Sequence, residues 1–249
     1  MVLNQIFKHF GFQIAKVKKK AVDQFYDLSA EEKKILELAN QYSMTGNDKI
    51  AQLIQALNYL EKHKIKGDIV ECGVWRGGSM LAAALTLIRN KSEERSLFLF
   101  DTFEGMNAPT EYDKNIIGIN AINKFEQLKI NENSSNYCYA DIDDVKKTMA
   151  LSNYPAEKVH FIKGMVEETL PHDKLNGIAL LRLDTDWYES TRHELIHLYD
   201  KVVQGGIIIF DDYGYWEGHR KAIDEYLLDN KIQLFLARTN AGGRIAVKY

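Results

Sequence analysis

The sequence predicts an α/β fold: a Rossmann-like, mostly parallel sheet covered by helices on both faces. From Gly67 onward, short apolar runs alternate with segments of helical periodicity. The runs are apolar at nearly every position, which is typical of strands buried between two helical layers. The chain closes with two short runs around the turn NAGG, which predict a terminal antiparallel hairpin.

Composition indicates one globular domain and excludes several classes of protein. The chain has 249 residues, of which 45% are apolar and 27% charged. A net charge of -3 offers no general positive field for nucleic acid. Cys72 and Cys138 are too few for a disulfide framework and have no zinc-site spacing. No apolar run approaches the ~20 residues that span a bilayer. We therefore expect a cytoplasmic protein that binds no nucleic acid.

Residues 1–66 are expected to form a helical extension before the sheet. Its first part, Met1 to Lys20, is basic and has apolar residues at helical spacing. This pattern favours a helix packed on its own core or on a second subunit, and hence a homo-oligomer. Contact with an anionic membrane surface is the alternative. The apolar positions of this segment are Leu3, Ile6, Phe7, Phe10, Ile14 and Val17.

Two further helices are predicted in the extension, over Ala30 to Asn40 and over Lys49 to His63. Ser29 is a plausible N-cap for the first of them. The acidic pair Glu31 and Glu32 would lie in its first turn, where a helix favours negative charge.

Residues 67–249 are expected to form the sheet domain. Its predicted strands are DIVECGV, SLFLFDTF, VHFIKG, IALLRLD and GGIIIFDD, and its hairpin is KIQLFLART with RIAVKY. Helices are predicted in MLAAALTLIRN, in Ser190 to Lys201 and in His219 to Leu228. Five strand-helix units before a hairpin suggest the class I methyltransferase sheet. The long polar segment 104–150 predicts either an acceptor-binding lid or a solvated loop.

Acidic residues gather where the predicted strands end. In an open parallel sheet, ligands bind beyond the carboxyl ends of the strands. Four of the five ends carry carboxylates, which apolar strands exclude unless they are paired, solvated or liganded. These residues are Glu71, Asp101, Asp184, and Asp211 with Asp212.

The segment Gly73 to Ser79, GVWRGGS, would bring backbone close to a ligand at the start of a helix. It matches neither GxGxxG nor a Walker loop, which disfavours a nicotinamide cofactor. Asp101 follows the next strand and can accept hydrogen bonds from both hydroxyls of a ribose. The alternative for Asp101 is a helix N-cap before Thr102.

A hard divalent cation is predicted at the ends of the fourth and fifth strands. Asp184, Asp211 and Asp212 would converge there without histidine or thiolate, a donor set that suits Mg2+ first and Mn2+ or Ca2+ next. The alternative is that Asp211 caps a helix and Asp212 faces water. Asp186 is expected to be solvated or to cap a helix.

The motifs together resemble the macrocin O-methyltransferase family, which comprises metal-dependent S-adenosylmethionine enzymes that methylate sugar hydroxyls. The resemblance runs from about Tyr42 to Leu228. It rests on four blocks in family order, which are YSMTGNDKIAQLIQALNYLEKHKIKGDIVECGVWRGGSM, LFLFDTFEGM, LLRLDTDWYESTRHELIHLYDKVVQGGIIIFDDYG and HRKAIDEYL.

The resemblance implies a role for each matching residue. Asp101 would accept the ribose hydroxyls, and the metal ligands would be Asp184, Asp211 and Asp212. Those that would bind or close over the rest of the cofactor are Met44, Thr45, Glu71, Gly73, Gly77 and Ser79. Two departures stand out. Trp187 occupies the place of the catalytic lysine of the related catechol O-methyltransferase, and Met165 follows Gly164 where many methyltransferases have an acid that holds the adenine.

The function expected is methyl transfer from S-adenosylmethionine to a hydroxyl of a sugar-containing substrate. A bound cation can lower the pKa of a coordinated hydroxyl by several units. Asp184 is the expected catalytic residue because it could take the proton beside the metal, with water or Asp186 as alternatives. The competing functions are methylation of a catechol or phenol, and a non-catalytic binding module with the same fold.

Overall fold

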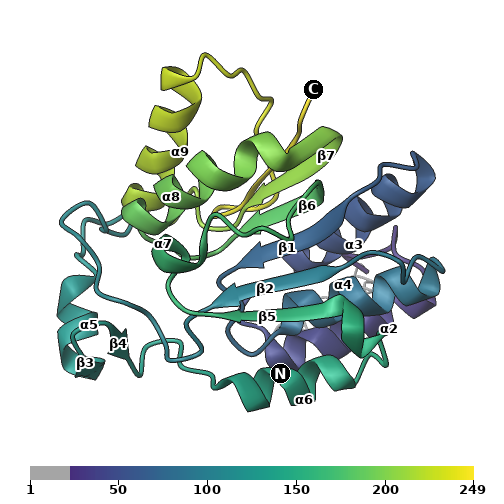
Figure 1. The fold of residues 1–249 in the computed structure, drawn as a ribbon, viewed down its shortest axis with the longest axis horizontal. Helices are drawn as coiled ribbons and strands as arrows, with labels where there is room; N and C mark the ends of the chain where they lie inside the picture. Colours follow the sequence, from purple (N-terminus) through teal and green to yellow (C-terminus); the bar gives the residue numbers. More distant parts are fainter. Residues whose placement is uncertain (1–22) are drawn as a thin grey trace, which may run out of the picture.

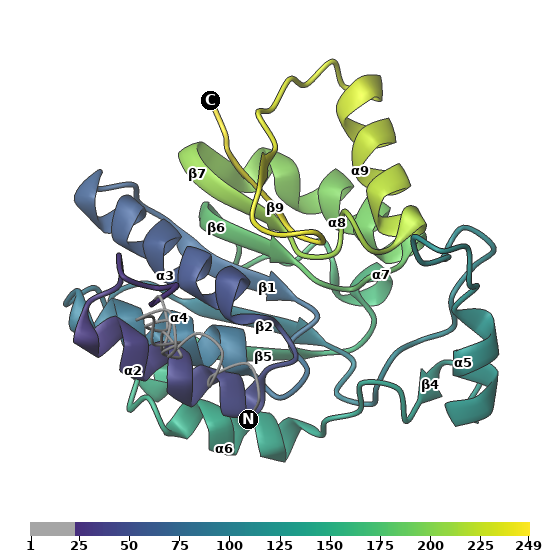
Figure 2. The ribbon, with the colours of Figure 1, turned by 180° about the vertical axis from the view of Figure 1, so that it is seen from behind.

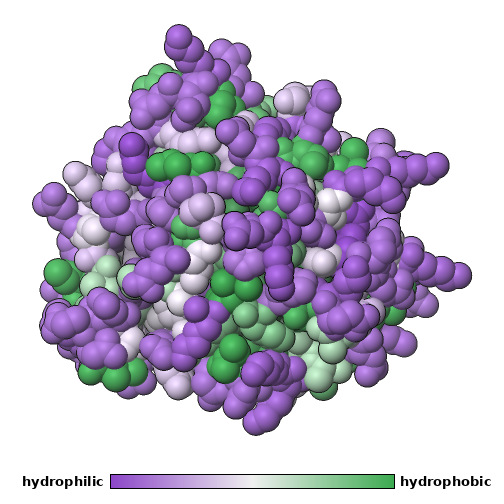
Figure 3. Space-filling view, viewed as in Figure 1, coloured by the Kyte–Doolittle hydropathy of each residue, from purple (hydrophilic) through white to green (hydrophobic). Residues whose placement is uncertain are grey.

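The computed structural model describes residues 23–249 (Figure 1). The predictions for Met1 to Lys20, both packing and membrane contact, lie outside these residues. Within residues 23–249, no helix has the length and apolar character needed to cross a membrane. Hydrophilic side chains cover most of the face seen in Figure 3, and hydrophobic ones appear between them in small groups.

The central sheet confirms the predicted fold class. It has seven strands in the order β5-β2-β1-β6-β7-β9-β8. The first five are parallel to one another, and β9 pairs antiparallel with both β7 and β8. The strands are β1 Asp68–Cys72, β2 Leu97–Asp101, β5 Val159–Lys163, β6 Ile178–Leu183, β7 Val202–Phe210, β8 Ala237–Arg238 and β9 Arg244–Val247. The strand order reverses between β1 and β6, where such sheets bind ligands.

Helices cover both faces of the sheet (Figures 1 and 2). One face carries α2 Ala30–Ala39, α3 Asn47–Lys62, α4 Gly78–Arg89 and α6 Ile142–Ala150. The other carries α7 Val166–Thr169, α8 Tyr188–Leu198 and α9 Glu217–Asp229. Neighbouring strand residues such as Ile69 and Val70 belong to different apolar clusters, because successive side chains point to opposite faces. The short 3-10 turns are η1 Asn40–Tyr42, η2 Ala156–Lys158 and η3 Tyr199–Lys201.

The helical extension begins and packs as its sequence favours. Ser29 caps α2 in a capping box: the Glu32 backbone N–H donates to the Ser29 hydroxyl, and the Ser29 N–H donates to the Glu32 carboxylate at 2.7 Å. On α3, Ile54 and Leu57 are fully buried. They belong to the same apolar cluster as Ile69 of β1, so the extension shares the core of the sheet.

The terminal hairpin is shorter than the sequence predicts. KIQLFLART reads as one strand, but only Ala237 and Arg238 pair with β9. Leu234 and Leu236 instead pack against the apolar cluster beneath α8 and α9, and Phe235 between them is exposed. Burial of these leucines on the helical side draws the segment away from the edge of the sheet.

The segment 104–150 contains α5 Ile122–Leu128 and a small antiparallel pair, β3 Lys129–Asn131 and β4 Ser134–Ser135, before α6. Its middle part lies to one side of the sheet (Figure 1). Asn115 forms a backbone bridge with Trp216, close to the start of α9. The segment is thus attached to the body of the protein beyond the carboxyl ends of the strands.

Candidate functional site

A cavity of about 460 Å³ lies beyond the carboxyl ends of β1, β2, β6 and β7. Three parts of the chain line it: the strand ends, the segment from Met44 to Lys49, and residues 105–138 of the insertion. Its volume is in the usual range for sites that hold small molecules. Of the residues predicted to bind the cofactor, Met44, Thr45, Gly73 and Asp101 line this cavity.

The carboxylate of Asp101 is fixed by the loop that follows β1. It accepts hydrogen bonds from the backbone N–H groups of Val74 at 2.6 Å and Trp75 at 3.0 Å, and from Phe103 at 2.7 Å. Burial raises the pKa of Asp101, and these N–H groups partly oppose the rise. The chain after Asp101 forms a turn instead of a helix, so the alternative of a helix N-cap is wrong. The ribose role stays a prediction.

Gly73 allows the loop to pass close to the end of β6. Its φ is +83°, and a Cβ there would lie 2.2 Å from the Asp184 carbonyl oxygen. Any other residue would therefore push the loop away from the strand that carries Asp184. The approach places the loop backbone and the Asp184 carboxylate on the wall of one cavity.

Glu71, Gly77 and Ser79, also predicted for the cofactor, lie behind the cavity wall. The Ser79 hydroxyl and the Arg182 guanidinium both donate to the Glu71 carboxylate. Burial raises the pKa of Glu71, and Arg182 opposes the rise. In this conformation the group supports the loop from within and has no direct face on the cavity.

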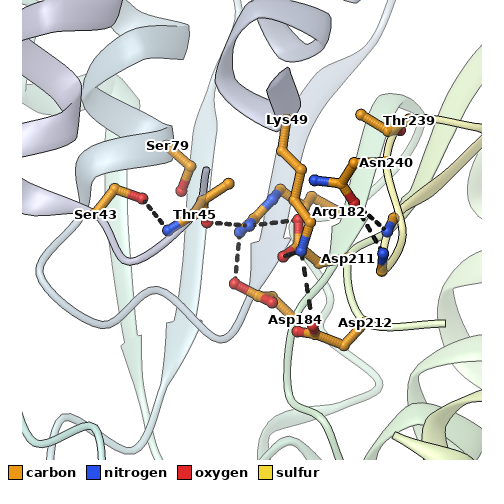
Figure 4. A network of polar contacts seen from close by, with 12 residues as sticks. Ser43, Thr45, Lys49, Ser79, Arg182, Asp184, Asp211, Asp212, Thr239 and Asn240 are labelled. Atoms are coloured by element: carbon orange, nitrogen blue, oxygen red, sulfur yellow. Dashed lines mark hydrogen bonds and ion pairs between the residues drawn. The ribbon is translucent and has the colours of Figure 1, made fainter. Parts of the chain in front are cut away.

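Arg182 is a residue that our sequence reasoning missed. Its guanidinium is buried and reaches Asp184 at 2.8 Å, Asp211 at 2.7 Å and the Thr45 hydroxyl at 2.8 Å (Figure 4). It also pairs with Glu71. Nearby carboxylates outweigh burial and hold its pKa well above the usual value. The available signal was a single charge within the otherwise apolar run IALLRLD.

Lys49 was also missed, because a lysine in the first turns of a helix is usually solvated. Its ammonium lies 2.6 Å from Asp211 and 3.6 Å from Asp212 (Figure 4). Burial would lower the pKa of Lys49, but Asp211, Asp212 and Asp184 outweigh it and raise the pKa. The ammonium is therefore a fixed positive charge beside the cluster of aspartates.

The carboxylates that meet in the cavity differ in part from the predicted set. One oxygen each from Asp184, Asp186 and Asp212 lies within 4.8 Å of the others. Asp211 instead faces Lys49 and Arg182, which outweigh burial and lower its pKa. Asp186 was expected to be solvated or to cap a helix. Its φ of +69° and the hydrogen bond from Trp187 N–H to the Thr185 carbonyl form a tight turn that places it beside the cavity.

This group fits a hard cation. Burial, together with Asp211, Asp212 and Asp186, raises the pKa of Asp184 well above its usual value, although Arg182 opposes the rise. Burial and the neighbouring Asp212 likewise raise the pKa of Asp186. Carboxylates this close repel one another, and a divalent cation relieves that repulsion. An all-oxygen donor set suits Mg2+ in particular.

The insertion and the start of α9 supply the other wall of the cavity. The Trp187 indole N–H donates to the Asn107 carbonyl at 3.1 Å, and its ring meets Trp216 edge to face at 5.0 Å. Trp187 is almost fully buried, so this residue is part of the frame and supplies no proton acceptor. The Lys124 ammonium lies 4.3 Å from the centre of the Tyr137 ring, and both side chains line the cavity.

A family model described as macrocin-O-methyltransferase (TylF) matches residues 6–243. The chain belongs to the macrocin O-methyltransferase family. The chain is similar to several curated relatives. It is 29% identical over 188 residues to the demethyldecarbamoylnovobiocin O-methyltransferase of Streptomyces niveus, and the match covers 76% of this chain and 68% of that protein. It is 25% identical over 185 residues to the mycinamicin III 3''-O-methyltransferase of Micromonospora griseorubida, covering 74% and 70%.

Solved structures agree with the family assignment. The O-methyltransferase NovP superimposes with a TM-score of 0.72 at 26% identity, covering 83% of this chain and 82% of that one. The calicheamicin methyltransferase CalS11 superimposes with a TM-score of 0.62 at 16% identity, covering 88% and 93%, a likeness of fold. This family member is therefore an S-adenosylmethionine-dependent O-methyltransferase with the class I fold, and the predicted family and activity are confirmed.

Proposed function

We propose that this O-methyltransferase methylates a hydroxyl of a sugar-containing acceptor while a divalent cation, Mg2+ first, orients and acidifies that hydroxyl. The observation that carries the proposal is the convergence of Asp184, Asp186 and Asp212 in the cavity that Asp101 and the Gly73 loop also line. A relative from Streptomyces olivaceus also supports the sugar acceptor, because its name specifies a dimethoxyrhamnosyl tetracenomycin 4'-O-methyltransferase. It is 27% identical over 185 residues, which cover 74% of this chain and 67% of that protein.

The cofactor would occupy the half of the cavity between β1 and β2. Asp101 would accept the ribose hydroxyls, and Gly73 would bring backbone close to the methionine part. Met44 and Thr45 would close over both ligands from the extension. Gly164 and Met165 line the cavity after β5, which suits backbone and apolar contact with the adenine. Glu71, Gly77 and Ser79 would act from behind by holding the loop in place.

The cation would lie at the ends of β6 and β7. Asp184 and Asp212 belong both to the set expected from the sequence and to the set that meets in the cavity. Asp186 and Asp211 are the rival third ligands. A bound cation lowers the pKa of a coordinated hydroxyl, which a sugar needs because its hydroxyls scarcely ionise at neutral pH. Two adjacent hydroxyls binding together would also fix the orientation of the acceptor.

Proton removal falls to an aspartate beside the acceptor. Asp184 is the residue expected from the sequence, yet its carboxylate forms an ion pair with Arg182 at 2.8 Å. Asp186 has no ion pair within 4.0 Å among residues 23–249, and its pKa is raised by burial and by Asp212. A carboxylate bound to the cation is a poor base, so Asp186 would take this role only if Asp211 were the third ligand. Asp184 stays the residue expected from the sequence, with Asp186 or water as the alternatives.

The metal requirement is tested by turnover and by binding. EDTA should abolish methylation of vicinal-diol sugars, and Mg2+ should restore it. Asp184→Asn and Asp212→Asn should weaken Mn2+ binding at least about tenfold, because each loses a charge next to the cation, while affinity for S-adenosylhomocysteine stays within twofold. Asp186→Asn and Asp211→Asn then identify the third ligand. Full turnover in EDTA would remove the metal from the mechanism.

The same acceptor panel decides between the competing functions. Catechol and simple phenols are included at matched concentrations. Preference for catechol would replace the sugar assignment, and absence of turnover with every acceptor, despite cofactor binding, would favour a non-catalytic module.

The cofactor site is tested by calorimetry with S-adenosylhomocysteine. Asp101→Ala should weaken binding at least about tenfold, since it removes the ribose acceptor and the anchor of the Val74 and Trp75 N–H groups. Asp143→Asn on the exposed side of α6 serves as the matched control and should bind like the wild type. Equal affinity in Asp101→Ala would show that the cofactor lies elsewhere.

We also propose that the protein acts in the cytoplasm as a homo-oligomer. The proposal rests on the two cysteines, neither paired, and on the basic amphipathic segment from Met1 to Lys20. Light scattering of the full chain should give a mass of at least twice 28.6 kDa. A monomer at micromolar concentration would contradict it.

A further inference from the structure

Lys49 connects the helical extension to the cluster of aspartates. It lies on the first turn of α3, and its ammonium is mostly buried between Asp211 and Asp212. No other lysine among the described residues forms an ion pair with these aspartates. The N-terminus of α3 has the positive end of the helix dipole, which adds to the same local charge.

Asp211 lines the cavity, and the charges around it explain why its carboxylate is not part of the cluster of Asp184, Asp186 and Asp212. The Asp211 carboxylate is held on one side by Lys49 at 2.6 Å and on the other by Arg182 at 2.7 Å. The Asp212 carboxylate lies 3.6 Å from the Lys49 ammonium, a longer ion pair than that of Asp211. Arg182 also pairs with Glu71 and Asp184, so its single positive charge is shared among three carboxylates.

We infer that Lys49 is a positioning residue that sets the cation affinity of the cluster formed by Asp184, Asp186 and Asp212. Its ammonium neutralises part of the negative charge of Asp211 and Asp212 and repels an incoming cation. Without Lys49, Asp211 keeps only its share of Arg182, and its carboxylate can join the cluster as a fourth ligand. The site then gains a negative charge and loses a positive one. The inference rests on the proposed metal site, yet it concerns binding and not turnover.

The test measures Mn2+ binding in the absence of cofactor and acceptor, by calorimetry or by the loss of free Mn2+ signal in electron paramagnetic resonance. Lys49→Met should bind Mn2+ at least about tenfold more tightly than the wild type, because one repulsive charge within a few ångströms is gone. Lys49→Arg keeps the charge and should bind like the wild type. The double variant Lys49→Met, Asp211→Asn removes both members of the pair and should return close to wild-type affinity.

Thermal unfolding gives a second reading that does not depend on detecting weak binding. In EDTA, Lys49→Met should melt below the wild type, since four carboxylates then share only Arg182 and Mn2+ is absent. Saturating Mn2+ should raise its melting temperature more than that of the wild type. A variant that loses its fold altogether would show no cooperative transition with Mn2+, and that result would contradict the inference.

The outcomes separate this inference from the proposed function. Tighter Mn2+ binding by Lys49→Met together with full turnover of the wild type in EDTA would support Lys49 and reject the catalytic metal. Unchanged or weaker binding by Lys49→Met, with a wild type that needs Mg2+ for turnover, would overturn the role of Lys49 alone. No binding by either protein up to millimolar Mn2+ would overturn both.

Discussion

Glu194 is a fully buried acid on α8, next to Thr185 and the Cys72 thiol. Burial raises its pKa well above the usual value, and the contact with Thr185 only partly opposes the rise. A carboxyl group with a raised pKa costs stability once the pH exceeds its pKa in the unfolded chain, because the unfolded state gains by ionising and the native state does not. This cost grows until the pH reaches the raised pKa.

Glu194→Gln should therefore become more stable relative to the wild type as the pH rises. The difference in unfolding free energy should be small near pH 4, where both states of the wild type keep the proton, and larger by about 1 kcal/mol or more at pH 8. Urea unfolding at several pH values measures it. Glu157→Gln on the exposed turn η2 is the control. A difference that does not change with pH would mean that Glu194 is ionised in the native protein.

At the residue scale, the sequence identifies what strand ends carry but not how the charges pair. Asp101, Asp184 and Asp212 could be placed at one edge of the sheet because parallel strands end together. That Asp186 takes the place of Asp211 in the cluster with Asp184 and Asp212 could not be foreseen. It depends on a left-handed turn at Asp186 and on the pairing of Asp211 with Lys49, which is far away in the sequence. Only the folded chain brings Lys49 to that edge.

At the scale of elements, Asp113 attaches the insertion to the helices beside the cavity. Its carboxylate is fully buried and accepts from the Thr110 N–H at 2.6 Å, the Thr110 hydroxyl at 2.9 Å and the Tyr188 N–H at 2.8 Å. Tyr188 is the first residue of α8, so the negative charge also meets the positive end of that helix. Burial raises the pKa of Asp113, and these donors oppose the rise.

Asp113→Ala should loosen the insertion without removing the cofactor site. It leaves the Tyr188 N–H without its partner, which costs about 1–3 kcal/mol. We expect KM for the acceptor to rise severalfold, affinity for S-adenosylhomocysteine to stay within twofold, and cleavage by trypsin after Lys114 to become faster. Glu111→Gln, an exposed neighbour, is the control. Unchanged acceptor KM and cleavage would show that the insertion is held by other contacts.

The elements themselves were largely predictable, and the failures have physical causes. The apolar runs of the parallel strands and the cap at Ser29 are local signals, and the structure follows them. The run KIQLFLART contains enough apolar residues for a strand, but its leucines find a better place against the helices. The small strands β3 and β4 lie in a polar segment with no alternation that would have indicated them.

At the scale of the whole molecule, the extension and the sheet domain should unfold together. Leu57 of α3 is fully buried in the cluster that also contains Ile69 and Leu99 of the sheet. Leu57→Ala should lower the free energy of unfolding by about 2–5 kcal/mol. The whole chain, including the sheet domain that S-adenosylhomocysteine stabilises, should still unfold in one transition at a lower temperature. Calorimetry distinguishes this result from two separate unfolding transitions of which only one shifts. Two transitions would support an independent extension ending near residue 66.

The buried guanidinium of Arg182 also favours the correct register between the central strands β1 and β6. Arg182 lies opposite Glu71 in the register of β6 with β1, so both side chains leave the same face of the sheet. A slip of β6 by one residue would move Arg182 to the opposite, apolar face and leave Glu71 buried without its partner. The neighbouring leucines and isoleucines could exchange places at little cost, since one apolar contact replaces another. The misaligned sheet would therefore be destabilised chiefly by two buried charges, Arg182 and Glu71, that have lost their ion pair.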